Sequence, residues 1–214
     1  MPKNESTPAL PPDYWRQASR ELARCDAVMK RLVRRFDGTT LTSRGDAFAT
    51  LARSIIGQQI SVKAAESIWQ RVVVASREMT PRAVLKLCPA TLTQCGLSRR
   101  KVEYLHDLAR HFQNSLLRVA DWPQLSDDEV IRDLIQVHGI GRWTAEMFLI
   151  FNLQRPNVLP LDDIGLQRAA GVLYFNGESP TRKQMISLAQ QWQPWCSVAT
   201  WYLWRSLDPV LVEY

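Results

Sequence analysis

Residues 125–170 read LSDDEVIRDLIQVHGIGRWTAEMFLIFNLQRPNVLPLDDIGLQRAA, and this stretch contains the pattern that decides the fold. It opens with Ser126 and, three residues later, Glu129, which is the spacing of a capping box at a helix N-terminus. Apolar residues then recur at helical spacing up to the first glycine. The sequence therefore predicts a helix over 127–137.

The four residues that follow, 138–141, read HGIG and interrupt this helix. Trp143, Met147 and Ile150 then recur at i, i+4 and i+7, which predicts a second helix ending near Gln154. Glycine permits a positive φ or the close approach of another backbone. Because exposed amides at a helix N-terminus stabilise an anion, the turn is expected to bind one.

The joint pattern of a helix, VHGIG, a helix beginning RWTA, and an aspartate after a proline-containing loop resembles the helix-hairpin-helix (HhH-GPD) DNA glycosylases. It is most similar to their alkylated-base branch, the 3-methyladenine DNA glycosylase II group. The resemblance covers roughly residues 46–207, and the combination of hairpin and aspartate is specific where a lone Gly-x-Gly would be weak. It implies an all-α fold of two helical subdomains with a cleft between them.

The helical periodicity agrees with that fold, with about ten helices expected and no convincing strand pairs. The polar, proline-rich residues 1–12 are expected to form a flexible tail. The resemblance implies a middle bundle over 50–155, which includes the helix-hairpin-helix at about 127–154. Residues 13–49 and 156–214 are expected to form the other subdomain together.

The family resemblance implies a catalytic aspartate twenty residues after the residue that follows Gly-Arg of the hairpin. Here Trp143 follows Gly-Arg, and Asp163 lies twenty residues beyond it. Spacing alone favours a cap role for both Asp162 and Asp163. The resemblance favours Asp162 as the cap and Asp163 as the carboxylate that faces the flipped nucleotide.

An ionised Asp163 suits cleavage of an N-glycosidic bond, because a carboxylate stabilises positive charge on the sugar and can orient the attacking water. A purine alkylated at N3 or N7 leaves as a neutral base and needs no strong general acid. The three histidines, His106, His111 and His138, have no spacing that demands an acid–base role. Bifunctional relatives have a Schiff-base lysine where this chain has Trp143, so we expect a monofunctional hydrolase without lyase activity.

Aromatic residues provide a candidate base pocket. Stacking and cation–π attraction of about 0.5–2 kcal/mol per contact would favour a flat, cationic base. Trp143, Trp204, Trp201 and Tyr202 are the candidates. Trp204 matches an active-site tryptophan of the branch by position, with Trp201 as the alternative. Aromatic residues at helical spacing are more often core, and this alternative stays open.

The turn at residues 57–61, GQQIS, lies between two expected helices. A plain polar helix junction would explain it. The resemblance instead implies a wedge that fills the space left by the flipped nucleotide, with Gln59 at the wedge position and Gln58 and Ile60 beside it. Arg99–Lys101, at the start of a further helix, either face DNA or form a solvated cluster.

The resemblance also implies a phosphate-binding hairpin that includes side chains and backbone amides. Its expected members are His138, Gly139, Ile140, Gly141, Arg142 and Thr144. Backbone carbonyls at Ile135, Val137 and Ile140 occupy the positions that hold a structural Na⁺ or K⁺ in relatives. No other cofactor is expected.

The composition restricts which class of protein the chain can belong to. The chain has 214 residues, 46% of them hydrophobic, which excludes a disordered class, and a net charge of +6, which suits a polyanion without proving one. Without an apolar leader or a membrane-length apolar run, a cytoplasmic monomer, nucleoid-associated when bound to DNA, is expected. The four cysteines, Cys25, Cys88, Cys95 and Cys196, are expected to be reduced, buried thiols. Their spacing lacks the pattern of an iron–sulfur cluster, so none is expected.

The sequence therefore predicts a DNA glycosylase of base excision repair that releases alkylated purines, chiefly 3-methyladenine and also 7-methylguanine, from double-stranded DNA. One alternative keeps the enzyme class but changes the lesion to uracil, an oxidised base or a deaminated purine. The other is a helix-hairpin-helix module that binds DNA without catalysis. That module would leave Asp163, the aromatic C-terminal region and the two glutamines at 58–59 unexplained.

Overall fold

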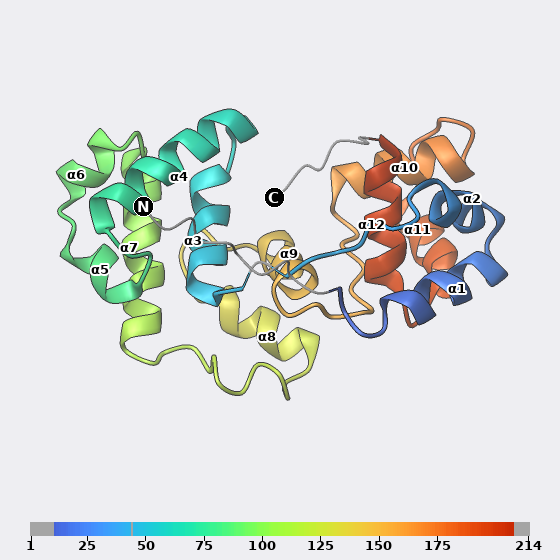
Figure 1. The fold of residues 1–214 in the computed structure, drawn as a ribbon, viewed down its shortest axis with the longest axis horizontal. Coiled ribbons are helices and arrows are strands. Elements are labelled where there is room, and N and C mark those ends of the chain that lie inside the picture. The colour runs from blue at the N-terminus through green and yellow to red at the C-terminus, as the bar shows by residue number, and fades with distance from the viewer. Residues whose placement is uncertain (1–10, 44, 208–214) are drawn as a thin grey trace. The chain divides into compact units, whose positions relative to one another are not determined.

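The computed structural model describes residues 11–43 and 45–207, and these residues contain helices but no strand (Figure 1). The all-α prediction is therefore confirmed. Most of the expected tail lies outside the described residues, and Pro12, which is described, is buried. The helices are α1 (Trp15–Cys25), α2 (Ala27–Arg35), α3 (Ala47–Gly57), α4 (Val62–Ser76), α5 (Pro81–Lys86), α6 (Pro89–Gln94), α7 (Arg99–Gln113), α8 (Asp127–Leu134), α9 (Arg142–Phe151), α10 (Ile164–Tyr174), α11 (Arg182–Ala189), the 3₁₀ helix η1 (Gln190–Trp192) and α12 (Cys196–Leu207).

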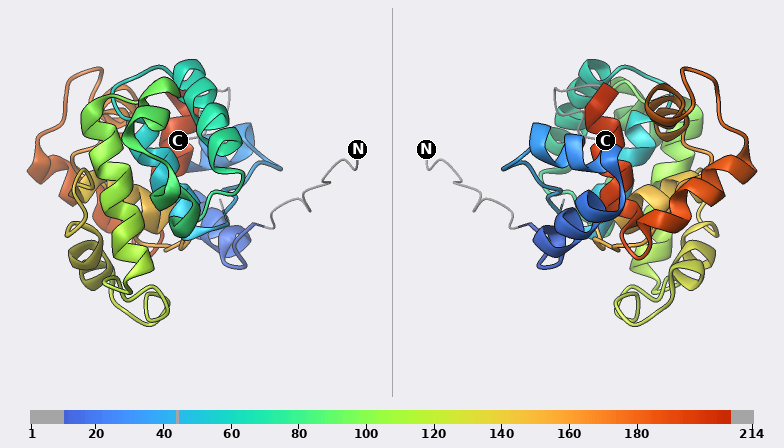
Figure 2. Two further views of the ribbon diagram at one scale, coloured as in Figure 1. Left: turned by 90° about the vertical axis from the view of Figure 1, so that its left-hand side faces the viewer. Right: turned by 90° about the vertical axis from the view of Figure 1, so that its right-hand side faces the viewer.

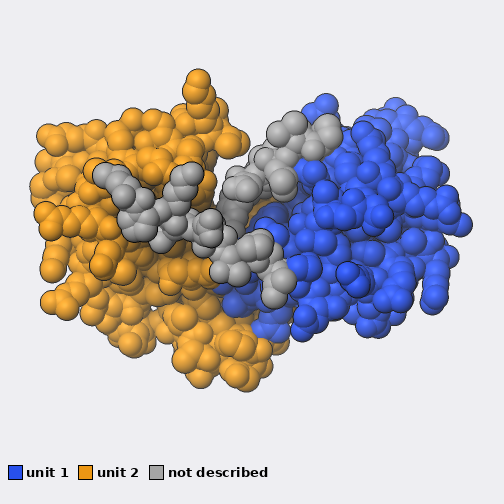
Figure 3. All heavy atoms as spheres, in the orientation of Figure 1, with its two compact units in different colours: residues 1–44, 149–211 blue, residues 45–148, 212–214 orange. Residues whose placement is uncertain are grey.

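The chain divides into two compact units (Figure 3). Among the described residues, unit 1 comprises 11–43 and 149–207, and unit 2 comprises 45–148. Unit 1 is thus built from segments at both ends of the chain. The boundaries lie a few residues earlier than the sequence predicts, and the second falls inside α9.

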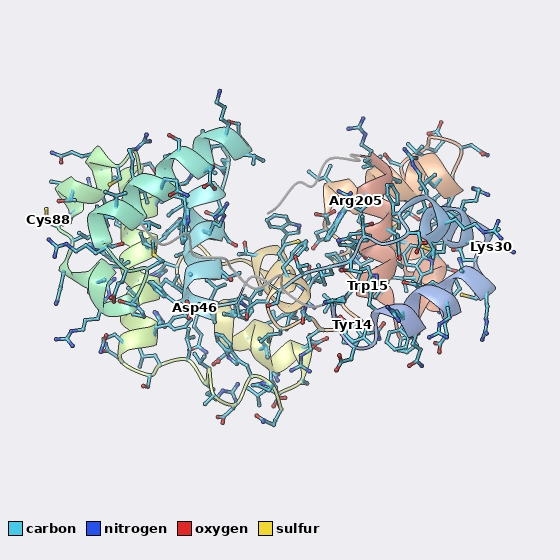
Figure 4. The ribbon with its side chains drawn as sticks, in the orientation of Figure 1. Tyr14, Trp15, Lys30, Asp46, Cys88 and Arg205 are labelled. Atoms are coloured by element: carbon cyan, nitrogen blue, oxygen red, sulfur yellow. The ribbon has the colours of Figure 1, made fainter. Side chains whose placement is uncertain are left out.

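Unit 1 is organised around α12, against which α1, α2 and α10 pack (Figures 1 and 2). Tyr14 and Trp15 lie at the start of α1 (Figure 4). Tyr14 stacks on Trp195, and Trp15 meets Trp201 edge to face. Asp26 caps α2 through the amides of the helix's first turn, and its second oxygen accepts a hydrogen bond from Trp192. The aromatic side chains therefore fill the core between helices from the two ends of the chain.

Unit 2 is organised around α7, which packs against α3, α5 and α6. Its N-terminus is capped by Ser98, whose hydroxyl accepts a hydrogen bond from the Lys101 amide. Its buried face includes Val102, Leu105 and Leu108. Lys101 of this helix contacts the turn at 57–61, and Asp107 contacts the hairpin.

The helix-hairpin-helix has the predicted start, but the connection between its helices is longer than predicted, at residues 135–141. The capping box of Ser126 and Glu129 is formed in both directions, which confirms the N-terminus of α8. The helix ends at Leu134 because its last carbonyl accepts the amide of Val137 in a closing turn. The second helix, α9, ends at Phe151, three residues short of the expected end.

Two of the four cysteines are exposed, so the expectation that all are buried thiols is wrong. Cys25 and Cys88 reach the surface, whereas Cys95 and Cys196 are buried. Cys88 lies at the N-cap of α6 and its side chain points outward (Figure 4). Over the described ranges, no cluster of three or more histidine, cysteine or acidic side chains could hold a metal ion, and no helix is long and apolar enough to cross a membrane.

Candidate functional site

Asp163 lies at the N-cap of α10 in unit 1, and its side chain is held by two donors. Its Oδ1 accepts the backbone amide of Leu166 at 2.6 Å and the indole Nε1 of Trp204 at 2.7 Å. The residue is only 7% exposed, whereas the next residue, Ile164, is 80% exposed. The carboxylate is therefore oriented by α10 and α12 together, directly beside exposed surface.

The expected division of roles between the two aspartates is wrong in one respect. Asp163, not Asp162, caps the helix. Asp162 is exposed and forms an ion pair of 2.6 Å with Arg182. Because capping needs only one hydrogen bond, here from the Leu166 amide to Oδ1, capping and a role toward a substrate are compatible in one residue. The helix dipole also favours a negative charge at this position.

A glycine and an aromatic stack shape the surroundings of Asp163. A Cβ atom built on Gly165 would lie 3.1 Å from Oδ1 of Asp163 and 3.2 Å from Cδ1 of Trp204, tighter than ordinary contact. The Trp204 ring stacks on Phe151, with centroids 5.7 Å apart and planes 13° apart. Trp204 is therefore in contact with Asp163.

Two other members of the expected base pocket belong to the core of unit 1. Trp201 is 4% exposed and Tyr202 is 2% exposed, and both pack against Trp15. The Tyr202 hydroxyl lies 3.0 Å from that of Ser19, and burial raises the pKa of this tyrosine. The protein surrounds these two side chains on all sides, so their assignment to a base pocket is wrong.

In the hairpin of unit 2, some backbone amides donate hydrogen bonds within the protein and others do not. The His138 amide donates to Oδ2 of Asp107 at 2.9 Å, and the Ile140 amide donates to the Val137 carbonyl at 3.1 Å. Within the described part of the chain, the amides of Gly139 and Gly141 have no such partner. The two glycine amides are therefore the ones that the turn offers to an external acceptor.

The other expected hairpin residues differ in what their side chains can reach. His138 is exposed, with Nδ1 at 3.2 Å from Oδ2 of Asp107. Arg142 forms ion pairs with Glu146 at 3.0 Å and Asp128 at 3.5 Å. Thr144 is buried, so its side chain does not face the solvent. Trp143, the remaining pocket candidate, is 38% exposed in the first turn of α9 in unit 2.

Asp107 is a residue that the sequence interpretation missed. Burial raises the pKa of its carboxyl, but hydrogen bonds from the His138 amide and Arg110, with the nearby His111 and His138 rings, outweigh burial and lower it. The one signal in the sequence was an acidic residue placed on the apolar face of the α7 helix, beside Leu105 and Leu108.

In the turn at 57–61, the structure separates the two glutamines. The side-chain amide of Gln58 donates to the Gly139 carbonyl at 2.8 Å, so the wedge assignment for Gln58 is wrong. Gln59 is exposed and adopts a φ of +58°, a left-handed conformation that directs its side chain away from the helical path. Ile60 is 38% exposed.

Lys101 does not belong with its two exposed neighbours, Arg99 and Arg100. Its ammonium donates to the carbonyl of Ile56 at 2.8 Å and of Gln58 at 2.6 Å, at the C-terminal end of α3. Burial lowers the pKa of this amine. The side chain therefore satisfies helix-end carbonyls rather than facing DNA.

Comparisons with known proteins identify the family of the chain. Residues 52–194 match the family model of the HhH-GPD superfamily base excision DNA repair proteins. The chain is 30% identical to the DNA-3-methyladenine glycosylase 1 of Schizosaccharomyces pombe over 89% of this chain and 86% of that protein. The chain therefore belongs to the HhH-GPD superfamily.

Two solved structures are similar over almost the whole chain. The DNA-3-methyladenine glycosidase of Bacillus halodurans is 33% identical, with a TM-score of 0.81 over 89% of both chains. The 3-methyladenine DNA glycosylase of S. pombe, solved in complex with abasic DNA, is 30% identical, with a TM-score of 0.78 over 92% of this chain and 98% of that one. The chain spans 62% and 66% of the length of two Bacillus subtilis relatives.

Proposed function

We propose that the chain is a monofunctional DNA glycosylase of base excision repair. It flips alkylated purines, chiefly 3-methyladenine and also 7-methylguanine, out of duplex DNA and hydrolyses the N-glycosidic bond to leave an abasic site. The observation that carries this proposal is the Asp163 carboxylate, fixed by the Leu166 amide and the Trp204 indole. The relatives described above from S. pombe and B. halodurans are named as 3-methyladenine DNA glycosylases or glycosidases, which supports the lesion class.

The proposed role of Asp163 is electrostatic. As the bond between the sugar and the base breaks, positive charge develops at the anomeric carbon, and a nearby carboxylate stabilises it. The two donors on Oδ1 hold the carboxylate in one orientation before the substrate arrives. It therefore needs little reorganisation during the reaction, and it also orients the attacking water.

The proposed DNA contact in unit 2 is a phosphate at the hairpin. The amides of Gly139 and Gly141, which donate to no acceptor among the described residues, lie beside the N-terminus of α9, where the helix dipole favours an anion. A Cβ atom on Gly141 would meet nothing within 4 Å, so the backbone there is open to a close approach. Gln59 and Ile60 are the proposed wedge residues that remain.

A structural alkali cation fits the carbonyls that end α8. Ile135, Val137 and Ile140 lie at and just beyond its C-terminus, where carbonyls lack intrahelical partners. The Val137 carbonyl accepts one amide and retains a second lone pair. A bound Na⁺ or K⁺ would add positive charge beside the phosphate. Replacing KCl by choline chloride at equal ionic strength should then weaken binding to duplex DNA. Unchanged affinity would exclude the proposed cation site.

The deciding experiment compares Asp163→Asn with Asp162→Asn on methylated duplex DNA. Asparagine is as good an N-cap as aspartate, so Asp163→Asn should fold normally. We expect it to release base at least about 100-fold more slowly than the wild type. Asp162→Asn, which loses only an exposed ion pair, should retain full activity. Undiminished base release by Asp163→Asn would exclude the proposed role.

The same assay decides between the alternatives. A panel of duplexes with uracil, 8-oxoguanine or hypoxanthine would reveal a glycosylase for another lesion. If the purified chain binds DNA with strong salt dependence and releases no base from any duplex, it is a binding module.

A further inference from the structure

The two turns proposed to meet DNA in unit 2 are held by one helix, α7. Lys101 of α7 donates to the carbonyls of Ile56 and Gln58 and so fixes the backbone that leads into the wedge turn. Six residues further along α7, Asp107 accepts the amide of His138 at the hairpin. The wedge turn, 57–61, and the hairpin are therefore both positioned relative to the same helix.

The ring of Tyr104, midway between Lys101 and Asp107, completes this arrangement. A Cβ atom built on Gly139 would lie 2.2 Å from Cδ2 of the Tyr104 ring, so the glycine backbone rests directly against it. Gly139 also has a φ of +88°, which strongly favours glycine. The hairpin therefore cannot move toward α7, and the Asp107 hydrogen bond prevents it from moving away.

One side chain connects the two turns directly. Gln58 donates from Nε2 to the Gly139 carbonyl at 2.8 Å across 81 residues of sequence. Its own carbonyl is held by Lys101, so both its main chain and its side chain are fixed. The next residue, Gln59, has the left-handed φ that sets the direction of its side chain. The orientation of Gln59 therefore depends on how Gln58 is anchored.

We propose that Gln58 is a positioning residue, which holds the Gln59 wedge at a fixed distance from the phosphate-binding hairpin. This inference rests on the proposed function. A wedge displaced by about 1 Å would fill the space left by the flipped nucleotide less well, and such misplacement slows reactions by about 10- to 100-fold. The amides of Gly139 and Gly141 would still bind the phosphate, so affinity for DNA would change little.

The variant that tests this is Gln58→Met, because methionine has a similar length and no amide donor. Gln113→Met, at the exposed C-terminal end of α7, is the matched control. On methylated duplex DNA with saturating enzyme, we expect Gln58→Met to release base about 10- to 100-fold more slowly, with DNA affinity within about threefold of the wild type. Gln113→Met should match the wild type in both. Full-rate base release by Gln58→Met, or an equal loss in both variants, would overturn the proposal.

A second readout needs no base release. In a duplex with 2-aminopurine beside an abasic analogue, wild-type binding should raise the fluorescence as the wedge disturbs stacking, and Gln58→Met should raise it by less than half as much. Equal fluorescence would overturn the role of Gln58. If the wild type releases no base, the proposed catalysis fails, and this measurement still decides the positioning role.

A double-mutant cycle with Gln59→Ala separates positioning from general stability. If Gln58 acts through the wedge, the double variant should be no slower than Gln59→Ala alone. Fully additive losses would contradict the inference. Thermal unfolding of each variant checks folding, and Gln58→Ala, which adds no bulk, replaces Gln58→Met in the same cycle if the latter fails to fold.

Discussion

The indole Nε1 of Trp204 donates a hydrogen bond of 2.7 Å to Oδ1 of Asp163, and the two residues lie 41 positions apart in the chain. The same oxygen accepts the Leu166 amide, so the carboxylate connects the N-terminus of α10 to the last turn of α12. The orientation of the proposed catalytic group therefore depends on tertiary packing within unit 1.

Removing the indole donor alone should slow base release. Trp204→Phe keeps an aromatic ring to stack on Phe151 but loses the hydrogen bond to Asp163. We expect about a 10-fold lower rate on methylated duplex DNA, because a loss of about 1.4 kcal/mol is typical for a bond to a charged group. Trp195→Phe, which removes an indole bond to Glu21, is the matched control and should not change the rate.

Adding a methyl group beside the carboxylate should disturb the same pair. Gly165→Ala would put its Cβ 3.1 Å from Oδ1 of Asp163 and 3.2 Å from the Trp204 ring, so these groups must shift by a few tenths of an ångström. We expect slower base release. Thermal stability should change little, because the preference of alanine over glycine in a helix, about 0.5–1 kcal/mol, offsets the cost of the close contacts. A variant as fast as the wild type would show that the carboxylate tolerates the shift.

The hairpin should not tolerate a side chain at its first glycine. Gly139→Ala would require a positive φ and would clash with Tyr104. We expect the free energy of unfolding to fall by more than about 1 kcal/mol, measured by urea denaturation. Adding Tyr104→Ala should remove the clash but not the backbone strain, so only part of the loss in the single Gly139→Ala variant should be recovered. Full recovery would show that the positive φ of residue 139 contributes nothing to the loss in the free energy of unfolding.

Asp107 should make the stability of the chain depend on pH in the acid range. Its pKa is lower in the folded chain than the reference of 3.8, so the carboxylate stabilises the fold at pH values above that reference. This contribution is lost as the pH falls through the reference value and then through the lower folded value. Urea denaturation from about pH 7 down to about pH 3 should therefore show a shrinking advantage over Asp107→Asn. A difference that stays constant with pH would contradict this assignment.

The absence of a lysine after Gly-Arg of the hairpin predicts no covalent intermediate. Trp143 occupies that position, and its indole cannot form a Schiff base. Incubation with an abasic duplex and borohydride should therefore trap no protein–DNA adduct on a denaturing gel. A trapped adduct would show that another amine performs lyase chemistry.

Much of the fold could be predicted because its signals are local. A capping box is set by two residues three positions apart, and the predicted one, Ser126 with Glu129, is formed. Helix ends were less well predicted, since α8 and α9 each stop three residues early where turns and tertiary contacts take over. Trp201 and Tyr202 were assigned to a base pocket because they are aromatic and close to Trp204 in the sequence, but neither property shows whether other side chains cover a residue in the fold.

By itself, the sequence determined that the chain is helical, that a glycine-rich hairpin joins two of its helices, and that an aspartate follows at a fixed spacing. Only the tertiary structure decided that Asp163 rather than Asp162 caps α10, and that Gln58 points to the hairpin while Gln59 is exposed. The physical reason is the range of the interactions. Caps and periodicity act within a few residues, whereas the partners of Asp163 and Gln58 lie 41 and 81 positions away and meet them only after the helices have packed.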